Sequence, residues 1–210
     1  MFISNSNKTL QIKNCTILHK NEISSDNVMS AIGIYFQNCT NIQVTDCTLT
    51  QNSYGMLLLN STNILIEEST FNNNKMTGIY SNHSSKNLFL NNNIKQNNNT
   101  GFILEFSDSN TISVHNISEN YFYGIHLKNS NENRIQDSYI QDNGKRNVFT
   151  QNSVGTQYSG NTRMEQWIEG FLVELGAVVF VTAYVIYKHS KDEKRYKIKK
   201  EFKKFIENDN

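Results

Sequence analysis

The chain has 210 residues, a formal net charge of +1, no proline and 33 asparagines. Its charge is uneven, because residues 1–187 contain 11 Lys and Arg against 14 Asp and Glu, whereas residues 188–210 contain 9 against 5. A mildly acidic body lacks the basic face with which proteins bind nucleic acid, so we expect no nucleic-acid partner. Three cysteines without a Cys-x-x-Cys pair are too few for a disulfide scaffold.

A repeat of 22 or 23 residues organises the chain from residue 33 to residue 143. In each unit a glycine is followed by a large apolar residue sixteen positions later and by an asparagine nineteen positions later. A fixed period in the low twenties is typical of a solenoid. The glycines are Gly33, Gly55, Gly78, Gly101 and Gly124, and the asparagines are Asn52, Asn74, Asn97, Asn120 and Asn143.

Each unit contains three short runs in which apolar and polar residues alternate, separated by Asn, Ser, Thr and Gly. Alternation with a period of two predicts half-buried strands, and the separating residues favour turns. If each strand pairs with its equivalent one unit further on, the fold is all-β. We therefore predict a right-handed parallel β-helix of about six to seven coils, with three short strands per coil, over residues 1–153. Residues 23–32 are extra relative to the other coils and are expected to form a loop.

The repeated polar positions predict internal ladders. Asparagine tolerates the left-handed backbone of sharp corners, and its amide can bond to its copy in the next coil. Cys39 shares its register with serines, and Cys15 and Cys47 share another. Stacked residues lie near disulfide range, so a disulfide and two free thiols both stay open, and the ladder favours free thiols. The position nine after the glycine changes from apolar to polar along the chain, in the order Leu10, Ile42, Ile64, Asn87, Asn110, Asn133.

The repeat decays after residue 153, and residues 154–164 are interpreted as a connector. Residues 165–187 are predicted to form one transmembrane helix, because no Lys or Arg occurs from Trp167 to Tyr187 and 21 helical residues reach about 31 Å. The lipid bilayer is thus an expected partner, and a helix buried in a soluble domain is the alternative. The expected interface residues are Trp167, Tyr184, Tyr187 and Lys188.

Residues 188–210 form a basic tail, which the positive-inside rule places in the cytoplasm with the β-helix outside. Met1 already lies within a coil, and neither a signal peptide nor a capping unit precedes it. Either a β-helix segment lies upstream or is supplied by a partner, or the β-helix stays in the cytoplasm. The first explanation is preferred, because it also accounts for the missing cap.

One group of carboxylates is a candidate catalytic site. Asp46 and Glu68 stand in the same register one coil apart, with Glu67 beside them. Two adjacent carboxylates can divide acid and base roles or bind a hard cation. Solvated surface charge is the favoured alternative. The five histidines are scattered over different registers, so no metal and no cofactor is predicted.

Aromatic residues are the candidate glycan-binding site. Tyr35, Tyr80 and His126 share the outward position two after the glycine, whereas Tyr54, Tyr121 and Tyr123 lie at one corner of the repeat. Flat rings with a polar edge suit sugar rings, although tyrosine is also common on the surface of strands.

The segments GIYFQNCTNIQVTDCTLTQN and GIHLKNSNENRIQDSYIQDN resemble the repeats of the NosD-like right-handed β-helix family, which is grouped with carbohydrate-binding proteins and sugar hydrolases. The resemblance covers residues 1–153 and implies an extracytoplasmic location and, in some relatives, polysaccharide binding or cleavage. For NosD it implies a role beside a transporter in copper-enzyme maturation. No catalytic residue can be carried over, because only structural positions are shared.

The sequence favours a membrane-anchored extracytoplasmic β-helix that binds glycans or serves as a structural column. A carbohydrate-active enzyme (a lyase, hydrolase or epimerase) and a NosD-like accessory of an ABC-type transporter are the alternatives.

Overall fold

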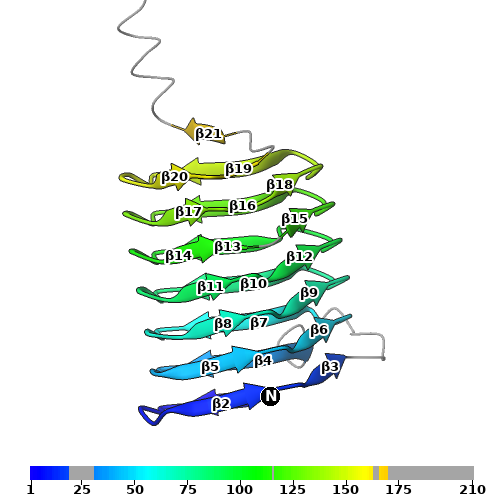
Figure 1. The fold of residues 1–210 in the computed structure, drawn as a ribbon, viewed down its shortest axis with the longest axis vertical. Helices are drawn as coiled ribbons and strands as arrows, with labels where there is room; N and C mark the ends of the chain where they lie inside the picture. The colour runs from blue at the N-terminus through cyan, green and yellow to red at the C-terminus, as the bar shows by residue number, and fades with distance from the viewer. Residues whose placement is uncertain (19–30, 115, 163–165, 170–210) are drawn as a thin grey trace, which may run out of the picture. The chain divides into compact units, whose positions relative to one another are not determined.

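The computed structural model describes residues 1–18, 31–114, 116–162 and 166–169, and these residues form a column of stacked β-coils (Figure 1). All described strands pair in parallel, each with its equivalent one coil away. Three sheets of eight, seven and six strands run along the column, and we call them sheets A, B and C. The predicted all-β coil with three strands per turn is confirmed.

The strands of each sheet recur at the repeat period. Sheet A contains β1 (Phe2–Ser4), β4 (Ile32–Gln37), β7 (Tyr54–Leu59), β10 (Thr77–Asn82), β13 (Phe102–Glu105), β16 (Tyr123–Lys128), β19 (Arg146–Gln151) and β21 (Gln166–Glu169). Sheet B contains β2 (Leu10–Lys13), β5 (Ile42–Thr45), β8 (Leu65–Glu67), β11 (Leu88–Leu90), β14 (Thr111–Ser113), β17 (Arg134–Gln136) and β20 (Gln157–Ser159). Sheet C contains β3 (Thr16–Leu18), β6 (Thr48–Thr50), β9 (Thr70–Asn72), β12 (Asn93–Lys95), β15 (Asn116–Ser118) and β18 (Ile140–Gln141).

The core is a set of apolar ladders between the three sheets. Ile79 of β10 pairs in register with Met56 and Phe102, and all three side chains are completely buried. Phe89 of sheet B packs edge-on against Phe102 of sheet A, with ring centroids 4.6 Å apart. The alternation predicted from the sequence therefore places one face of every sheet inside the column.

The predicted asparagine ladder closes one inner corner of the column. Asn97 is buried, and its Oδ1 accepts hydrogen bonds from the backbone N–H and the Nδ2 of Asn74. Its Nδ2 donates to the carbonyl oxygen of Phe71 and to Oδ1 of Asn120. The same pattern joins Asn120 to Asn143. Each amide thus satisfies backbone groups that the corner would otherwise leave unpaired.

The polar shift in the core is also confirmed. Ile42 and Ile64 are buried in the N-terminal coils, and Asn87, Asn110 and Asn133 are buried at the same register further on. The Oδ1 atoms of these asparagines accept backbone N–H groups of the preceding coil, as Asn110 does from Asn87 at 2.8 Å.

The three cysteines are free thiols. Cys39 lies in the predicted small-residue stack, where its backbone N–H donates to Oγ of Ser61. Burial, followed by a side-chain hydrogen bond with Cys47, raises the pKa of the Cys15 thiol to about 12. The interpretation as stacked thiols is therefore confirmed over the disulfide.

The solenoid continues beyond the predicted boundary at residue 153. Strand β20 lies inside the segment interpreted as a connector and pairs with β17, and β21 pairs with β19. Trp167 of β21 stands in register with Phe149, so the predicted helix does not begin at residue 165. The prediction from hydropathy missed strand β21, because a strand of a solenoid and the end of a membrane span are both rich in apolar and aromatic residues.

The rest of the predicted span and the basic tail, including Tyr184, Tyr187 and Lys188, lie outside the described residues. Within the part of the chain that the structure describes, there is no helix of the length and apolarity that a bilayer crossing needs.

Candidate functional site

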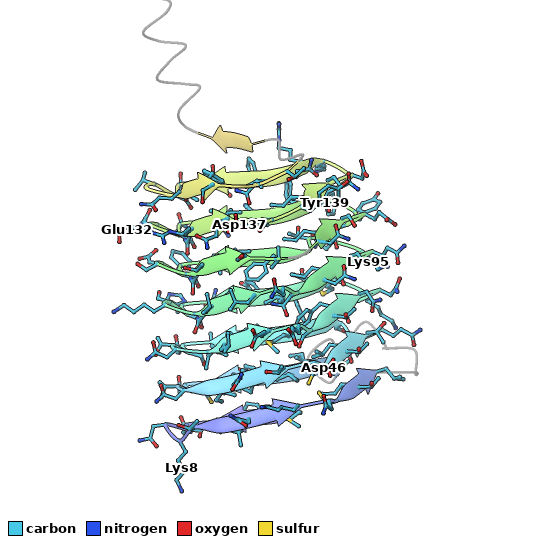
Figure 2. All side chains as sticks on the ribbon, viewed as in Figure 1. Lys8, Asp46, Lys95, Glu132, Asp137 and Tyr139 are labelled. Atoms are coloured by element: carbon cyan, nitrogen blue, oxygen red, sulfur yellow. The ribbon has the colours of Figure 1, made fainter. Side chains whose placement is uncertain are left out.

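The carboxylate of Asp46 lies at an exposed corner between sheets B and C (Figure 2). Glu68 is exposed at the equivalent corner one coil further on. Each has a left-handed backbone, with φ of 55° for Asp46 and 50° for Glu68. Asn91 and Asp137 have the same conformation at the same register. Aspartate and asparagine tolerate this region better than most residues, which gives the position a structural role at the turn. The half-buried Glu67 ends β8 beside Glu68, and a catalytic role for the three stays a prediction.

The outer face of sheet A carries the aromatic residues. One column, at the position two after the glycine, contains in register Tyr35, Leu57, Tyr80, Ile103, His126 and Phe149. A neighbouring column contains Tyr54 beside Thr77, and Tyr123 beside Arg146. The register that Tyr35, Tyr80 and His126 share in the sequence thus corresponds to the outer face of sheet A.

Four of the six predicted aromatic residues fall into two clusters on this face. Tyr54 stacks on Tyr80 with ring centroids 5.9 Å apart. Tyr123, His126 and Phe149 form the second cluster, with centroids 5.0 to 5.2 Å apart. The two clusters are two coils apart, or about 9.6 Å.

The other two predicted aromatic residues lie elsewhere. Tyr35 packs against Phe2, 4.9 Å away, at the N-terminal end of the column. Tyr121 is 67% exposed at the corner that precedes β16 and packs edge-on against Phe122.

A groove separates the two aromatic clusters. Strand β13 places Ile103 between Tyr80 and His126 in the column, so an aliphatic side chain stands where both neighbours have rings. The resulting hollow has a volume of about 250 Å³. We call it the sheet A groove, and it is lined by Tyr54, Met76, Thr77, Tyr80, Asn99, Ile103, Glu105, His126 and Lys128.

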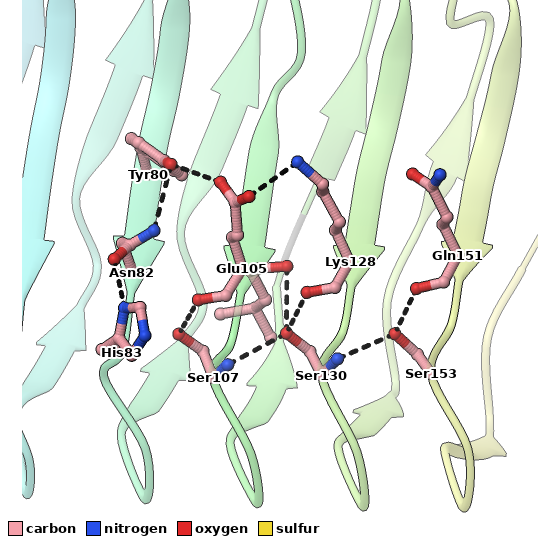
Figure 3. A network of polar contacts seen from close by, with 10 residues as sticks. Tyr80, Asn82, His83, Glu105, Ser107, Lys128, Ser130, Gln151 and Ser153 are labelled. Carbon is pink, nitrogen blue, oxygen red and sulfur yellow. Dashed lines mark hydrogen bonds and ion pairs between the residues drawn. The ribbon is translucent and has the colours of Figure 1, made fainter.

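A polar network forms one edge of the groove (Figure 3). Nζ of Lys128 lies 2.7 Å from Oε1 of Glu105, and the phenol of Tyr80 donates to Oε2 of the same carboxylate at 2.5 Å. The Tyr80 oxygen in turn accepts a hydrogen bond from Nδ2 of Asn82. Three neighbouring strands, β10, β13 and β16, therefore supply one connected chain of polar atoms.

The network fixes the charges of its members. Burial raises the pKa of Glu105, but hydrogen bonds from Lys128 and Tyr80 and the charges of Lys128 and His126 lower it more, so the net pKa is below the ordinary value. Burial, followed by the hydrogen bond to Glu105, raises the pKa of Tyr80 to about 12. At neutral pH Glu105 is a carboxylate and Tyr80 is a neutral phenol.

The sequence interpretation missed Glu105, Lys128 and Ile103. Glu105 and Lys128 both stand four positions after their glycines and pair in register. An acidic and a basic residue at one register of adjacent coils is a signal of an outer-face ion pair, which a register-by-register reading of charges would have found.

A second hollow, of about 510 Å³, lies at the corner that leads into β16 and is lined by Glu119, Asn120, Tyr121, Phe122, Asp142, Gly144 and Lys145. Nζ of Lys145 lies 4.5 Å from the centroid of the Phe122 ring and so covers one of its faces. Glu119, Asp142 and Lys145 are all exposed. The sheet A groove is the better candidate, because its polar groups are partly buried and hold one another in place.

Residues 32–182 of the chain match a known family, described as the right-handed β-helix region. The chain belongs to this family. The match confirms the predicted handedness, and the narrower NosD-like grouping stays a prediction. No curated protein matches the chain.

Several solved β-helices resemble this one. They include pectate lyase Pel9A (16% identity, TM-score 0.59, covering 69% of this chain and 40% of that one) and a variant of the periplasmic alginate epimerase AlgG (11%, 0.55, 77% and 47%). The A-module of the mannuronan C-5 epimerase AlgE6 of Azotobacter vinelandii is a third (14%, 0.53, 74% and 51%). This chain spans between 40% and 51% of their lengths, and at such low identity the likeness shows the fold alone.

In this β-helix the sheet A groove offers stacking rings on two sides and hydrogen-bonding groups along an edge. Concave sites of this composition hold small organic groups, with apolar contacts for affinity and a few polar atoms for orientation. The groove is open and on the outer face, so a ligand bound there can extend past it along the column.

Proposed function

We propose that this β-helix is a binding module for a glycan that lies along the outer face of sheet A. The observation that carries the proposal is the sheet A groove between two aromatic clusters. Sugar rings have flat apolar faces and a hydroxyl rim, so Tyr54 and Tyr80 on one side can stack while Glu105 and Lys128 bind hydroxyls. The names of the structurally similar lyase and epimerases mention pectate, alginate and mannuronan, and they support a polysaccharide as the general class of ligand without indicating its charge.

Binding is favoured over catalysis by the protonation states in the groove. A general acid or base works best when its pKa lies near the working pH. The pKa of Glu105 is lowered and that of Tyr80 is raised to about 12, so both shifts lead away from neutrality. A carbohydrate-active enzyme is the second candidate, and a transporter accessory rests on the sequence resemblance alone.

Removing the Tyr80 ring tests the site. In the full-length protein Tyr80→Ala is expected to weaken binding to the best ligand of a polysaccharide panel by about tenfold, or about 1.4 kcal/mol, because the stacking surface is lost. Tyr80→Phe keeps the ring and is expected to retain most of the affinity. Affinity gel electrophoresis, followed by calorimetry, measures both variants.

The matched control is Tyr139→Ala, since Tyr139 is a half-buried tyrosine immediately before β18 of sheet C, and its hydroxyl donates a hydrogen bond to Oε1 of Gln141. Equal loss in the sheet A and sheet C variants would contradict the assignment of the groove. Turnover of a bound polysaccharide by the wild-type protein would favour the enzyme instead.

We also propose that the β-helix is extracytoplasmic and anchored by residues 170–187. This segment has no Lys or Arg, and helical residues in that number reach about 27 Å, close to the thickness of a bilayer core. The nine Lys and Arg of residues 188–210 support a cytoplasmic tail. This topology allows the groove to meet glycans outside the cell.

Cysteine labelling tests this topology. A membrane-impermeant maleimide is expected to label Asn98→Cys in intact cells, because Asn98 is exposed on the β-helix, and to label Lys199→Cys only after permeabilisation. The signal is read against the wild-type protein, in which Cys39 and Cys47 are buried and Cys15 is half-buried. Labelling of position 199 but not of position 98 in intact cells would reverse the proposal.

A further inference from the structure

We propose that the sheet A groove selects an uncharged glycan over an acidic one. The inference rests on the proposed glycan binding and names the class of ligand. It is carried by the ion pair between Glu105 and Lys128, which leaves the groove with balanced charge.

The ion pair already neutralises the ammonium group of Lys128, which an acidic sugar would need as its partner. Among the described residues that line the groove, Lys128 is the one ammonium group, and it lies 2.7 Å from the Glu105 carboxylate. The Glu105 side chain is only 17% exposed and that of Lys128 is 41% exposed. The phenol of Tyr80 also donates to Glu105, so the carboxylate is held from two sides.

A uronate in the groove would bring a second negative charge close to this carboxylate. It would either share Lys128 with Glu105, at the cost of repulsion, or displace Glu105 from Lys128. The second event leaves a largely buried carboxylate without its cation, which is strongly unfavourable. A neutral hydroxyl avoids both costs, because it donates to a carboxylate and accepts from an ammonium group without disturbing the pair.

The other Lys and Arg side chains near this face lie beyond the groove. Arg146 follows Tyr123 in its column, one coil further on, and Lys145 covers the Phe122 ring at the corner. Neither lines the hollow between the two aromatic clusters. Apart from the imidazole of His126, whose charge also lowers the pKa of Glu105, the positive charge in contact with a sugar in the groove is that of Lys128.

Removing the negative charge of Glu105 tests the inference. The full-length wild-type protein is expected to bind at least one of dextran, galactan and galactomannan more tightly than polygalacturonate or alginate. Glu105→Gln keeps the shape of the side chain but frees Lys128, so it is expected to gain about fivefold in affinity for polygalacturonate or alginate. The gain is expected at about 50 mM NaCl and is lost at about 300 mM.

Two controls separate local from general charge effects. Glu119→Gln removes one negative charge from an exposed residue of the second hollow and is expected to leave the preference unchanged. The double variant Glu105→Gln with Lys128→Gln is expected to lose the gain, because the freed cation is gone.

The outcomes distinguish the two proposals. Tighter binding of an acidic polysaccharide by the wild-type protein, or no gain in Glu105→Gln, would overturn the selectivity while glycan binding stands. If no polysaccharide of either class binds, the proposed function fails as well.

Discussion

Replacing Asn97 by alanine is expected to lower the free energy of unfolding by about 3–5 kcal/mol, because several buried groups lose their partners together. The lost acceptor served the N–H and the Nδ2 of Asn74. The lost donor served the Phe71 carbonyl and Oδ1 of Asn120. Urea denaturation followed by circular dichroism measures the change, together with the midpoint of thermal unfolding.

The neighbouring Asn98 provides the matched control. Its side chain is exposed, so Asn98→Ala is expected to change the stability by less than about 0.5 kcal/mol. Similar small effects at both positions would show that the ladder of amides does not hold the corner. Because each coil contacts only its neighbours, the loss at Asn97 should appear first in the coils on either side.

Replacing Gly78 by alanine is expected to destabilise the protein by about 2–4 kcal/mol, because a Cβ has no room at this position. It would lie 2.7 Å from the backbone oxygen of Gly101 and 2.8 Å from Cγ2 of Ile94. The backbone oxygen belongs to the next coil, so the two coils would have to separate. The same denaturation measurement applies.

Trimming Ile94 offers a sharp check on this explanation. Ile94→Ala removes the clash with Ile94 but leaves the Gly101 oxygen, and Nδ2 of Asn97 at 3.0 Å, in place, so the double variant with Gly78→Ala is not expected to recover the loss. Full recovery would show that side-chain packing, and not the approach of the two backbones, selects glycine there.

The recurring glycine explains how the scaffold presents the site. Gly78 and its equivalents hold consecutive coils in contact just before the outward column of sheet A. The register of this column is thereby fixed, and Tyr80, Ile103 and His126 follow one another without slippage. The groove has a defined shape because Ile103, which lacks a ring, lies between Tyr80 and His126 in this regular column.

The candidate carboxylates show where a pattern in the sequence was ambiguous. Asp46 and Glu68 recur at one register, which fits a pair of catalytic acids and equally fits a repeated turn. Both residues have a left-handed backbone, because the chain turns at this corner in every coil, and this explains why the position recurs. Spacing reports that two residues share a position, but it does not report the backbone conformation that the position requires.

The sequence by itself determined the period, the three strands per coil, the asparagine ladder, the polar shift of the core and the outward position of Tyr35, Tyr80 and His126. These follow from local alternation and from spacing, because in a solenoid every coil repeats the contacts of the coil before it. The sequence did not determine where the solenoid ends, since β19 has Asn147 at the register where the sheet A strands of earlier units have glycine.

Only the tertiary structure decided which aromatic residues meet and what lies between them. Tyr54 of one column stacks on Tyr80 of the neighbouring column. Ile103 leaves a hollow because Tyr80 and His126, which flank it in the column, carry rings. The sequence register places Glu105 and Lys128 on adjacent strands, and the tertiary structure decides that their side chains meet. Which neighbouring side chains turn toward each other is decided by tertiary packing, so a repeat that predicts the scaffold well says little about the site built on it.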